Sequence, residues 1–352
     1  MNRLLSIGSH IKNSSIANSS RFLKSYSSVT MSRPSNGYEL NHTMLRIRDP
    51  VRSLEFYEKN FGMKLLERMD VPELGFTNYF LGFTGAGALH GDKPWYEREG
   101  VLELCHNHGA ENDVNFNVNN GNKEPHRGFG HICFSVDNLQ VLHDELLANG
   151  VQFQKKLTDG RQKDIAFALD PDGYWIELIG NKSLAGKKVE GKADLSSLRF
   201  NHSMIRVKDP EKSLKFYRDT LGMSLLRTSV VEAAKFNLYF LGYTKDPNYK
   251  DNSYGDTSNR ETMLELTWNY GTESDPDFHY HNGNDQPQGF GHLGITVPDV
   301  QEAMDRLEND GVSIKKRKHE GKMKFIGFVL DPDGYWVEIL PRAPLPDKIL
   351  SD

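Results

Sequence analysis

The feature that most constrains this chain is a duplication that covers nearly all of it. Residues 41–50 (Asn-His-Thr-Met-Leu-Arg-Ile-Arg-Asp-Pro) recur as residues 201–210 (Asn-His-Ser-Met-Ile-Arg-Val-Lys-Asp-Pro). Two further motifs recur about 160 residues later, namely Gly-Phe-Gly-His at 128–131 and 289–292, and Asp-Pro-Asp-Gly-Tyr-Trp-(Ile/Val)-Glu at 170–177 and 331–338. The sequence therefore predicts two homologous units in tandem.

The duplication also sets the domain boundaries that we expect. The repeats would form two domains at residues 38–180 and 198–342, joined by a polar, Gly- and Lys-bearing linker at 181–197. A leader at 1–37 precedes them, and a tail at 343–352 with two prolines follows them. A chain of 352 residues also exceeds what one hydrophobic core usually supports, which agrees with two domains.

Each repeat divides again into two smaller modules. In the first module an alternating strand begins at His42, and an amphipathic helix follows with Asp49 as its N-cap, Pro50 at its first position and Gly62 as its stop. The second module has an alternating strand from His131 and a helix that ends near residue 150. Short strands follow each helix, and the last carries a Glu between apolar residues. The sequence thus predicts an α+β fold of four βαβββ modules.

The His on each first strand and the Glu on each last strand allow two interpretations. A single Glu on a strand is usually an outward residue of a half-solvated sheet. At Glu177 this interpretation is weak, because Trp175 and Ile179 share its face and the other face is also apolar. A buried carboxylate that lacks a cation or a proton costs several kcal/mol, so four matched pairs favour metal ligation.

The predicted ligands set the chemistry of these sites. They are four histidines and four glutamates: His42, Glu103, His131, Glu177, His202, Glu265, His292 and Glu338. Eight ligands make two sites of two His and two Glu, and such ligands suit Zn²⁺, Ni²⁺, Co²⁺, Mn²⁺ or Fe²⁺. Cys105 and Cys133 each share a strand face with a predicted ligand, and we interpret them as small buried thiols. The Asp-Pro-Asp-Gly segments are interpreted as turns.

Composition excludes several classes of protein. With 43 basic and 48 acidic side chains, the formal net charge of −5 offers no basic footprint for nucleic acid. No run of about 18 apolar residues occurs, so no membrane-spanning helix is expected. Two cysteines are too few for a disulfide scaffold, and they fit a reducing compartment.

The N-terminal leader differs in composition from the rest of the chain. Residues 1–38 contain no Asp or Glu, are rich in Ser and carry five basic residues. That composition is typical of a mitochondrial targeting segment, with a disordered tail as the alternative interpretation. Initiation at Met31, just before the first repeat, would give a cytosolic product. We therefore expect both a mitochondrial and a cytoplasmic form.

Four repeated motifs in this sequence resemble those of a known enzyme family. The motifs Leu-Glu-Leu-X-X-Asn-X-Gly, Asn-Gly-Asn-X-X-Pro, Gly-Phe-Gly-His and Asp-Pro-Asp-Gly-Tyr-Trp-(Ile/Val)-Glu each occur twice and closely resemble the glyoxalase I (lactoylglutathione lyase) family of the vicinal-oxygen-chelate superfamily. Each repeat is similar to a whole subunit of the dimeric enzymes, so the chain resembles the fused fungal type, a monomer with two active sites. The animal enzymes have Gln at the positions of His42 and His202, and this chain departs there as the fungal enzymes do.

The resemblance implies how the modules and ligands combine. Modules would pair into curved eight-stranded sheets, and each sheet would wrap one Zn²⁺, giving two ions per chain. The pairing of the first module with the fourth, and of the second with the third, is implied by the family alone. One site would then hold His42, Glu103, His292 and Glu338, and the other His202, Glu265, His131 and Glu177.

The resemblance further implies a substrate and a set of residue roles. The substrate would be the hemithioacetal of methylglyoxal and glutathione, isomerised to S-D-lactoylglutathione, with no nucleic-acid or membrane partner. Glu177 and Glu338 match the catalytic base, while Glu103 and Glu265 match ligands that stay bound. The residues that match or line the glutathione pocket are Arg46, Asn107, Arg127, Arg161, Arg206, Asn269, Gln288, Lys322 and Met323. Two alternatives stay open, an extradiol-dioxygenase-like oxidoreductase with two His, one Glu and Fe²⁺, and a metal-free small-molecule-binding protein of the same fold.

Overall fold

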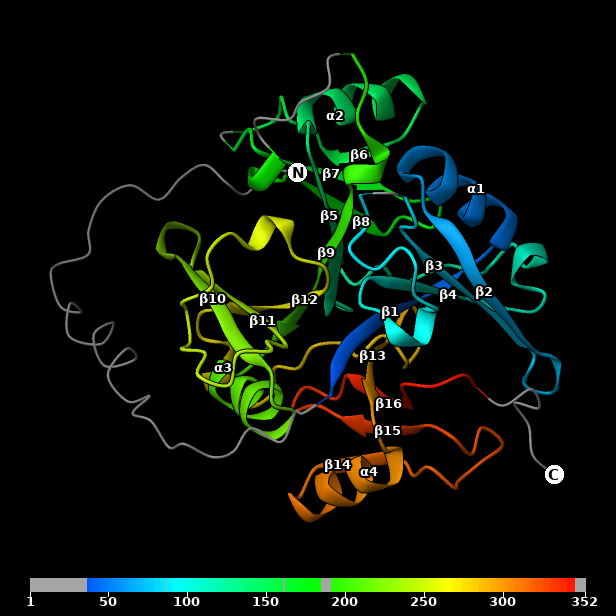
Figure 1. The fold of residues 1–352 in the computed structure, drawn as a ribbon, viewed down its shortest axis with the longest axis vertical. Coiled ribbons are helices and arrows are strands. Elements are labelled where there is room, and N and C mark those ends of the chain that lie inside the picture. The colour runs from blue at the N-terminus through cyan, green and yellow to red at the C-terminus, as the bar shows by residue number, and fades with distance from the viewer. Residues whose placement is uncertain (1–36, 86, 161, 185–190, 346–352) are drawn as a thin grey trace, which may run out of the picture. The chain divides into compact units, whose positions relative to one another are not determined.

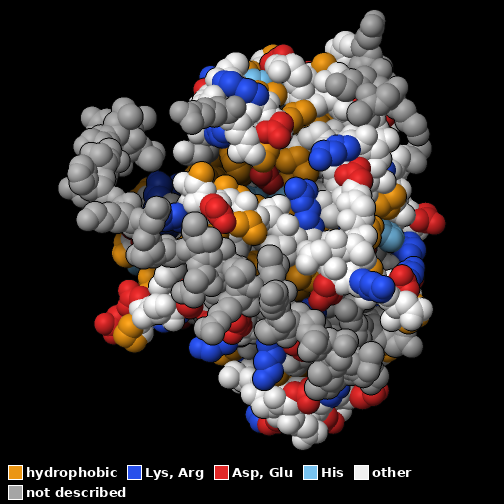
Figure 2. All heavy atoms as spheres, turned by 90° about the vertical axis from the view of Figure 1, so that its left-hand side faces the viewer, with side chains coloured by type: hydrophobic (Ala, Val, Ile, Leu, Met, Phe, Trp, Pro, Cys, Tyr) orange, Lys and Arg blue, Asp and Glu red, His pale blue; other side chains and the backbone are white. Residues whose placement is uncertain are grey.

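A computed structural model describes residues 37–85, 87–160, 162–184 and 191–345 (Figure 1), and all of them belong to one compact unit. The predicted leader, the alternative start at Met31 and the predicted pocket residue Arg161 lie outside the described residues. Among the described residues, no helix has the length and apolar character needed to cross a membrane. On the face shown in Figure 2, acidic and basic side chains lie interspersed.

The prediction of four βαβββ modules is confirmed. The first module is β1 (Glu39–Ile47), α1 (Pro50–Phe61), β2 (Lys64–Val71), β3 (Phe76–Gly82) and β4 (Val101–Asn107). The second is β5 (Phe129–Val136), α2 (Leu139–Ala148), β6 (Phe153–Lys155), β7 (Ile165–Leu169) and β8 (Trp175–Gly180). The third is β9 (Arg199–Val207), α3 (Pro210–Leu214) with a π-helical continuation over Lys215–Thr220, β10 (Ser224–Val231), β11 (Phe236–Gly242) and β12 (Met263–Asn269). The fourth is β13 (Phe290–Val297), α4 (Val300–Asn309), β14 (Ser313–Lys316), β15 (Gly327–Leu330) and β16 (Trp336–Pro341).

The modules pair across the repeats into two eight-stranded sheets. One sheet has the order β14-β15-β16-β13-β1-β4-β3-β2, so it joins the fourth module to the first. The other has the order β10-β11-β12-β9-β5-β8-β7-β6 and joins the third module to the second. The two modules of each sheet meet at an antiparallel pair, β1 with β13 and β5 with β9. Each sheet is therefore built from both halves of the duplication.

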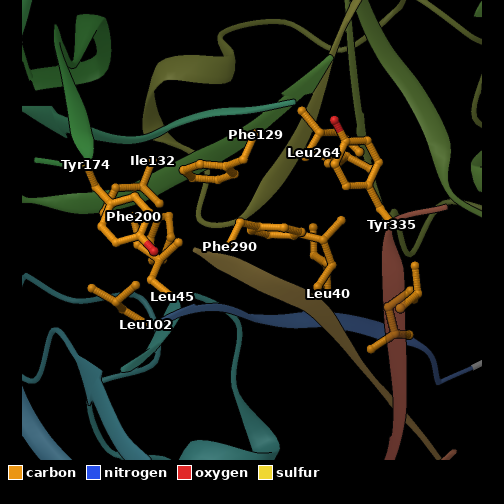
Figure 3. Packing of buried hydrophobic residues seen from close by; sticks show 14 of the residues in the cluster. Leu40, Leu45, Leu102, Phe129, Ile132, Tyr174, Phe200, Leu264, Phe290 and Tyr335 are labelled. Atoms are coloured by element: carbon orange, nitrogen blue, oxygen red, sulfur yellow. The ribbon is translucent and has the colours of Figure 1, made fainter. Parts of the chain in front are cut away.

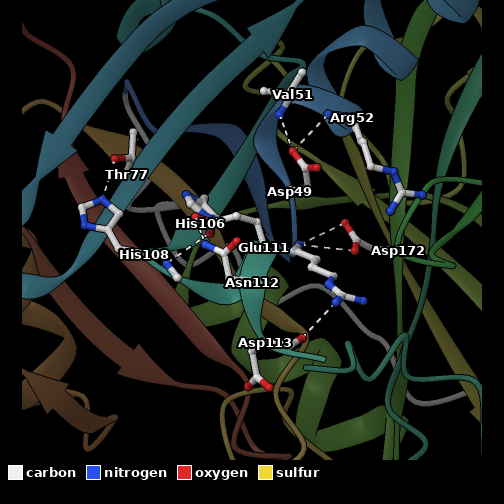
Figure 4. Close-up of polar contacts among 12 residues, drawn as sticks. Asp49, Val51, Arg52, Thr77, His106, His108, Glu111, Asn112, Asp113 and Asp172 are labelled. Carbon is white, nitrogen blue, oxygen red and sulfur yellow. Dashed lines mark hydrogen bonds and ion pairs between the residues drawn. The ribbon is translucent and has the colours of Figure 1, made fainter. Parts of the chain in front are cut away.

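Local sequence explains where the first helix begins and ends. The Asp49 side chain accepts hydrogen bonds from the backbone N–H groups of Val51 and Arg52 (Figure 4), as an N-cap should. Gly62 ends the helix with a φ of 70°, which a residue with a side chain rarely adopts. Tyr57 and Phe61 are buried, so the predicted cap, stop and amphipathic character of this helix are confirmed.

The glycines of the repeated Gly-Phe-Gly-His motif bring the two repeats into close contact. A Cβ on Gly128 would lie 2.0 Å from the carbonyl oxygen of His281, and one on Gly289 would lie 1.8 Å from that of Asn119. The phenylalanines between these glycines, Phe129 and Phe290, stack on each other with ring centroids 4.9 Å apart (Figure 3). The motif therefore joins the repeats within the main hydrophobic cluster.

The Asp-Pro-Asp-Gly-Tyr segments are turns that also fasten the modules together. Asp170 accepts hydrogen bonds from the backbone N–H groups of Asp172 and Tyr174, and its second oxygen accepts one from the Tyr57 hydroxyl at 3.0 Å. Tyr174 in turn donates its hydroxyl to the backbone carbonyl of Arg46 on β1. The second repeat has the same network at Asp331.

Burial raises the pKa of Asp170 and of Asp331 to about 7, from an ordinary value near 3.8. A raised carboxyl pKa means that the protonated form stabilises the fold, and this stability is lost as the pH rises through the folded pKa. We expect each group to lower the free energy of unfolding by about 1 kcal/mol between pH 6 and pH 8. Urea unfolding measures this free energy. Between pH 6 and pH 8 the double variant Asp170→Asn with Asp331→Asn should lose about 2 kcal/mol less of it than the parent.

The exposed Asp305 provides the control, because it lies on a helix and accepts a hydrogen bond from Gln301, four residues earlier. Its replacement by Asn should leave the parent's loss of stability unchanged. If the Asp170/Asp331 variant lost as much stability as the parent over this range, the two buried carboxyls would not be its source.

Candidate metal centres and substrate pocket

The eight predicted ligands lie on the central strands of the two sheets. In the first sheet the neighbours β16, β13, β1 and β4 carry Glu338, His292, His42 and Glu103, in that order. In the second sheet β12, β9, β5 and β8 carry Glu265, His202, His131 and Glu177. Register explains the convergence, since Met44 on β1 lies opposite His292 on one neighbour and Glu103 on the other. Four adjacent strands thus direct one ligand each to a common point.

The first centre is compact and buried. The donor atoms of His42, Glu103, His292 and Glu338 all lie within 4.8 Å of one another. His42 Nε2 lies 3.0 Å from Glu103 Oε2, 3.2 Å from Glu338 Oε2 and 3.1 Å from His292 Nε2. His292 Nε2 lies 3.3 Å and 3.4 Å from the same two carboxylate oxygens. The structure therefore gathers these four predicted ligands at one point.

The second centre has the same arrangement. His202 Nε2 lies 3.1 Å from Glu177 Oε2, 3.0 Å from Glu265 Oε2 and 3.2 Å from His131 Nε2. The distances from His131 Nε2 to the two carboxylates are slightly longer, at 3.5 Å and 3.9 Å. All four side chains are buried. Each centre combines two ligands from one repeat with two from the other.

An asparagine fixes which nitrogen of His42 faces the centre. Asn41 donates its side-chain amide to the backbone carbonyls of Trp95 and Arg98, which leaves its Oδ1 as an acceptor 2.7 Å from His42 Nδ1. We therefore assign the proton to Nδ1, so that Nε2 presents a lone pair to the centre. Asn201 does the same for His202 in the second centre.

The histidines and glutamates of the first centre shift one another's pKa values. Burial opposes the charged form of His42, but its hydrogen bonds to Glu103 and Glu338 raise the pKa of that imidazole to about 9. Burial opposes the charge on Glu338 as well, yet the attraction of His292 lowers the pKa of that carboxyl to about 2. Burial also opposes the charge on Glu103, yet hydrogen bonds from the two histidines lower the pKa of that carboxyl, so both glutamates are ionised at neutral pH. Because the pKa of His42 is raised, its Nε2 must release a proton before it can bind a metal ion.

The donor set fits a divalent metal ion. Two carboxylates balance a charge of +2, which removes the cost of burying either partner alone. Ligands that each lie about 2.0–2.2 Å from one ion are separated by about 3.0–3.5 Å, and most of the distances above fall in that range. Nitrogen and oxygen donors without thiolate suit Zn²⁺ and its first-row neighbours.

A pocket of about 230 Å³ opens beside the first centre and includes Glu103, His292 and Glu338 in its lining. Besides these three ligands its polar lining consists of Arg46, Asn78, Asn107 and Asn284, while most of the remaining lining is apolar or aromatic. Cys105 also lines it, and burial raises the pKa of this thiol to about 12. Cys133 is fully buried beside the second centre, and burial raises its pKa too. Both cysteines are thus buried neutral thiols, as predicted.

The residues that the resemblance assigns to glutathione lie in different environments. Arg46, Asn107 and Met323 line the pocket at the first centre. Gln288 donates to the backbone carbonyl of Asn284 in the same region, whereas Lys322 is exposed. On the side of the second centre, Asn269 donates to the Tyr280 hydroxyl at 3.0 Å. Burial lowers the pKa of the Arg206 guanidinium, and the nearby positive charge of Arg127 lowers it further.

Arg46 and Arg206 also hold the structure together, which the sequence did not indicate. Arg206 donates to the backbone carbonyls of Gly121, Gly128 and Phe129 and to the side chain of Asn122. Arg46 makes the equivalent contacts in the second repeat. These guanidinium groups therefore position the loop that precedes each β-strand carrying His131 or His292.

Two kinds of functional residue were missed by sequence reasoning. Asn41 and Asn201 orient ligands, and the repeated Asn-His dipeptide was the signal that could have revealed them. Trp95 lines the pocket at the first centre, but it has no matching Trp in the second repeat, so the duplication gave no signal for it.

Comparison with known proteins places this site in a family. A family model described as the Glyoxalase/Bleomycin resistance protein/Dioxygenase superfamily matches residues 39–178 and 199–339. The chain is 48% identical over 310 residues to the glyoxalase I of Saccharomyces cerevisiae, covering 86% of this chain and 92% of the yeast protein. It is 46% identical over 306 residues to the lactoylglutathione lyase of Schizosaccharomyces pombe, covering 87% and 97%.

Solved structures agree with this placement. The crystal structure of glyoxalase I from Zea mays matches with a TM-score of 0.62 and 28% identity, over 87% of this chain and 92% of the maize chain. The fold and the two centres thus define a member of the glyoxalase/dioxygenase superfamily. Within it, the chain belongs to the glyoxalase I family, the metal-dependent lactoylglutathione lyases, which are carbon–sulfur lyases.

Proposed function

We propose that this protein isomerises the hemithioacetal of methylglyoxal and glutathione to S-D-lactoylglutathione, with one Zn²⁺ at each of two active sites. The observation that carries this proposal is the pair of buried centres of two His and two Glu in a chain of the glyoxalase I family. A fourth donor in each centre argues against an extradiol-dioxygenase-like reaction at two His and one Glu. A metal-free binding protein would have no use for two buried clusters of acceptors.

The residue types support the proton transfer that this isomerisation needs. A proton leaves C1 of the hemithioacetal and returns at C2, so no external oxidant or reductant takes part. A divalent ion in the centre supplies charge stabilisation for the substrate oxygens. Glu338 in the first centre and Glu177 in the second are ionised at neutral pH, because nearby histidines hold the pKa of each carboxyl low despite burial. These two carboxylates accept the proton and return it.

The polar lining of the pocket suits the glutathione part of the substrate. Glutathione carries two carboxylates and an ammonium group, which guanidinium and amide side chains bind well. Arg46 and Asn107 supply such groups at the first centre. Both centres are completed within one chain, so we infer that a monomer carries two working sites.

Metal removal is expected to abolish the activity. Dialysis against a strong chelator should eliminate the glutathione-dependent loss of methylglyoxal. Zn²⁺ should restore this activity at two ions per chain, because four ligand atoms converge in each of the two centres. Removal should also lower the melting temperature, because an ion that binds only the folded chain stabilises it. Activity that survives full metal removal, or that needs no glutathione, would contradict the proposal.

The two sites are expected to differ in their affinity for the glutathione part. Arg127 precedes the Gly-Phe-Gly-His motif of the first repeat, while Gln288 takes this place in the second. A charge-assisted hydrogen bond contributes about 1.5–3 kcal/mol, against about 0.5–1.5 kcal/mol for a neutral one. Arg127 is partly exposed, so we expect a difference of about 1 kcal/mol, or several-fold in KM.

Single variants isolate the sites for this measurement. Glu338→Gln leaves the second centre active, and Glu177→Gln leaves the first. With methylglyoxal, the variant that retains the first centre should show the higher KM. Equal values would reject the difference, and Arg127→Gln should remove it without affecting the first centre.

A further inference from the structure

The pocket at the first centre has an apolar wall that is separate from the main core. A second hydrophobic cluster contains Met69, Phe80, Trp95 and Ile326, with Met323 and Phe325 packed against it. These six side chains all line the pocket. A hydrophobic cluster that borders a pocket leaves apolar surface available to a ligand.

This wall begins beside the metal ligands. Trp95 belongs to a short 3₁₀ helix, η2 (Trp95–Glu97), and its ring stacks on Phe80 with centroids 4.0 Å apart and an interplanar angle of 20°. The ring centroids of Phe80 and Trp95 lie 6.2 Å and 6.4 Å from the centroid of the His42 imidazole. An apolar group attached to a carbon beside the metal would therefore meet these two rings first.

The second centre has polar side chains at four of the six equivalent positions and keeps an apolar residue at the other two. Hydrogen bonds establish the correspondence: Asn41 donates to the carbonyl of Trp95, and Asn201 donates to that of Thr257 in the matching 3₁₀ helix. Likewise Lys316 donates to the carbonyls of Met323 and Ile326, and Lys155 donates to those of Gln162 and Ile165. Trp95 and Met323 at the first centre thus correspond to Thr257 and Gln162 at the second.

Two more positions follow from the same correspondence. Phe325, two residues beyond Met323, matches Asp164, two residues beyond Gln162. Met69 lies opposite Asn78 in the β2–β3 pair, and Ser229 lies opposite Leu238 in the β10–β11 pair. The polar replacements leave the neighbouring aromatic ring more exposed at the second centre. Phe80 is buried at the first centre, whereas its equivalent Phe240 is only half-buried.

Topology explains part of this difference. Among the described residues no strand follows β16, and Leu345 packs against the wall and lines the pocket. After β8 the chain must continue to β9, and Leu184, which corresponds to Leu345, lines another cavity with Asp194 and Arg199. The leucine at this position therefore lines the pocket at the first centre, whereas its equivalent in the first repeat lines a different cavity.

We propose that the two sites of this chain have different substrate ranges, a proposal that rests on the function proposed above. The centre of His42, Glu103, His292 and Glu338 accepts hemithioacetals of aldehydes with large apolar substituents, such as an aromatic ring. The centre with Thr257, Gln162 and Asp164 acts on hemithioacetals with small substituents. The charged glutathione part is common to all these substrates and cannot enter an apolar wall, so the aldehyde substituent is the part that meets it.

The expected effect is about tenfold. Burying two methylene groups or a comparable part of an aromatic ring changes binding by about tenfold, which corresponds to about 1.4 kcal/mol. With glutathione present, the ratio of kcat/KM for phenylglyoxal to that for methylglyoxal should be about tenfold higher for Glu177→Gln than for Glu338→Gln. Equal or reversed ratios would overturn the proposal.

Exchanging the wall residues between the two sites tests whether they cause the difference in substrate range. In the Glu177→Gln background, adding Trp95→Thr, Met323→Gln and Phe325→Asp should lower the ratio toward that of the second site. In the Glu338→Gln background, adding Thr257→Trp, Gln162→Met and Asp164→Phe should raise it. The first triple variant removes the buried Trp95 and could unfold. The second exchange and the single variant Met323→Gln therefore keep the test decisive, and a ratio that stays constant in both contradicts the proposal.

A binding measurement separates this proposal from the proposed function. Calorimetry with S-benzylglutathione and S-methylglutathione, which cannot be isomerised, should show about a tenfold preference for the benzyl compound only when the first wall is intact. If the parent chain failed to consume methylglyoxal with glutathione, the proposed function would fail. If the parent were active but both sites preferred the same thioether equally, only the difference in substrate range would fail.

Discussion

Replacing both Glu177 and Glu338 with glutamine is expected to lower isomerase turnover by about 10²–10⁴-fold while the protein stays folded. Each carboxylate lies at the centre of its site, and His202 Nε2 and His42 Nε2 lie 3.1 Å and 3.2 Å from their oxygens. Glutamine has the same shape, but its amide cannot accept the proton that leaves C1. Steady-state kinetics with methylglyoxal and glutathione measure the loss, and circular dichroism reports the fold.

A second Glu pair provides a matched control. Glu111 contacts His106 at 2.7 Å (Figure 4), and its equivalent Glu273 accepts from the Trp268 indole. Both lie outside the two centres, so Glu111→Gln with Glu273→Gln should leave turnover close to that of the parent. Each single active-site variant should keep the activity of its remaining site. A double Glu177/Glu338 variant with near-parent turnover would show that another group moves the proton.

The internal repeat explains why so much of the fold could be predicted. Caps such as Asp49 and stops such as Gly62 are local signals, because the groups that satisfy them lie within a few residues. Burial of Glu177 could also be foreseen from its apolar neighbours on both faces of the strand. These arguments need no knowledge of which strands lie side by side.

The pairing of modules across the repeats is a different kind of information. Whether β1 pairs with β13 or with β5 depends on contacts between segments that lie far apart in the chain, and spacing does not determine them. Only the family resemblance gave that arrangement. Trp95 and the dual role of Arg46 were not predictable for the same reason, since both depend on what a distant segment places beside them.

Replacing Asn41 with alanine is expected to weaken metal binding at the first centre by about 10–100-fold and to leave the second centre unchanged. The Oδ1 of Asn41 lies 2.7 Å from His42 Nδ1 and accepts its proton. Loss of this acceptor frees the imidazole to rotate or to carry a proton on Nε2, which then repels a cation. Stability should also fall, because the carbonyls of Trp95 and Arg98 lose their donor.

Metal competition against a calibrated chelator resolves this effect. The parent should release its two ions over one range of chelator concentration, whereas Asn41→Ala should release one ion early and one ion at the parent's concentration. Asn201→Ala is the matched variant and should weaken the second centre instead, through His202. Combining Asn41→Ala with Glu338→Gln should cost no further turnover, because both changes disable the same centre. If Asn41→Ala retained two ions of parental affinity, the asparagine would serve only the fold, and the orientation of His42 would have to come from its strand alone.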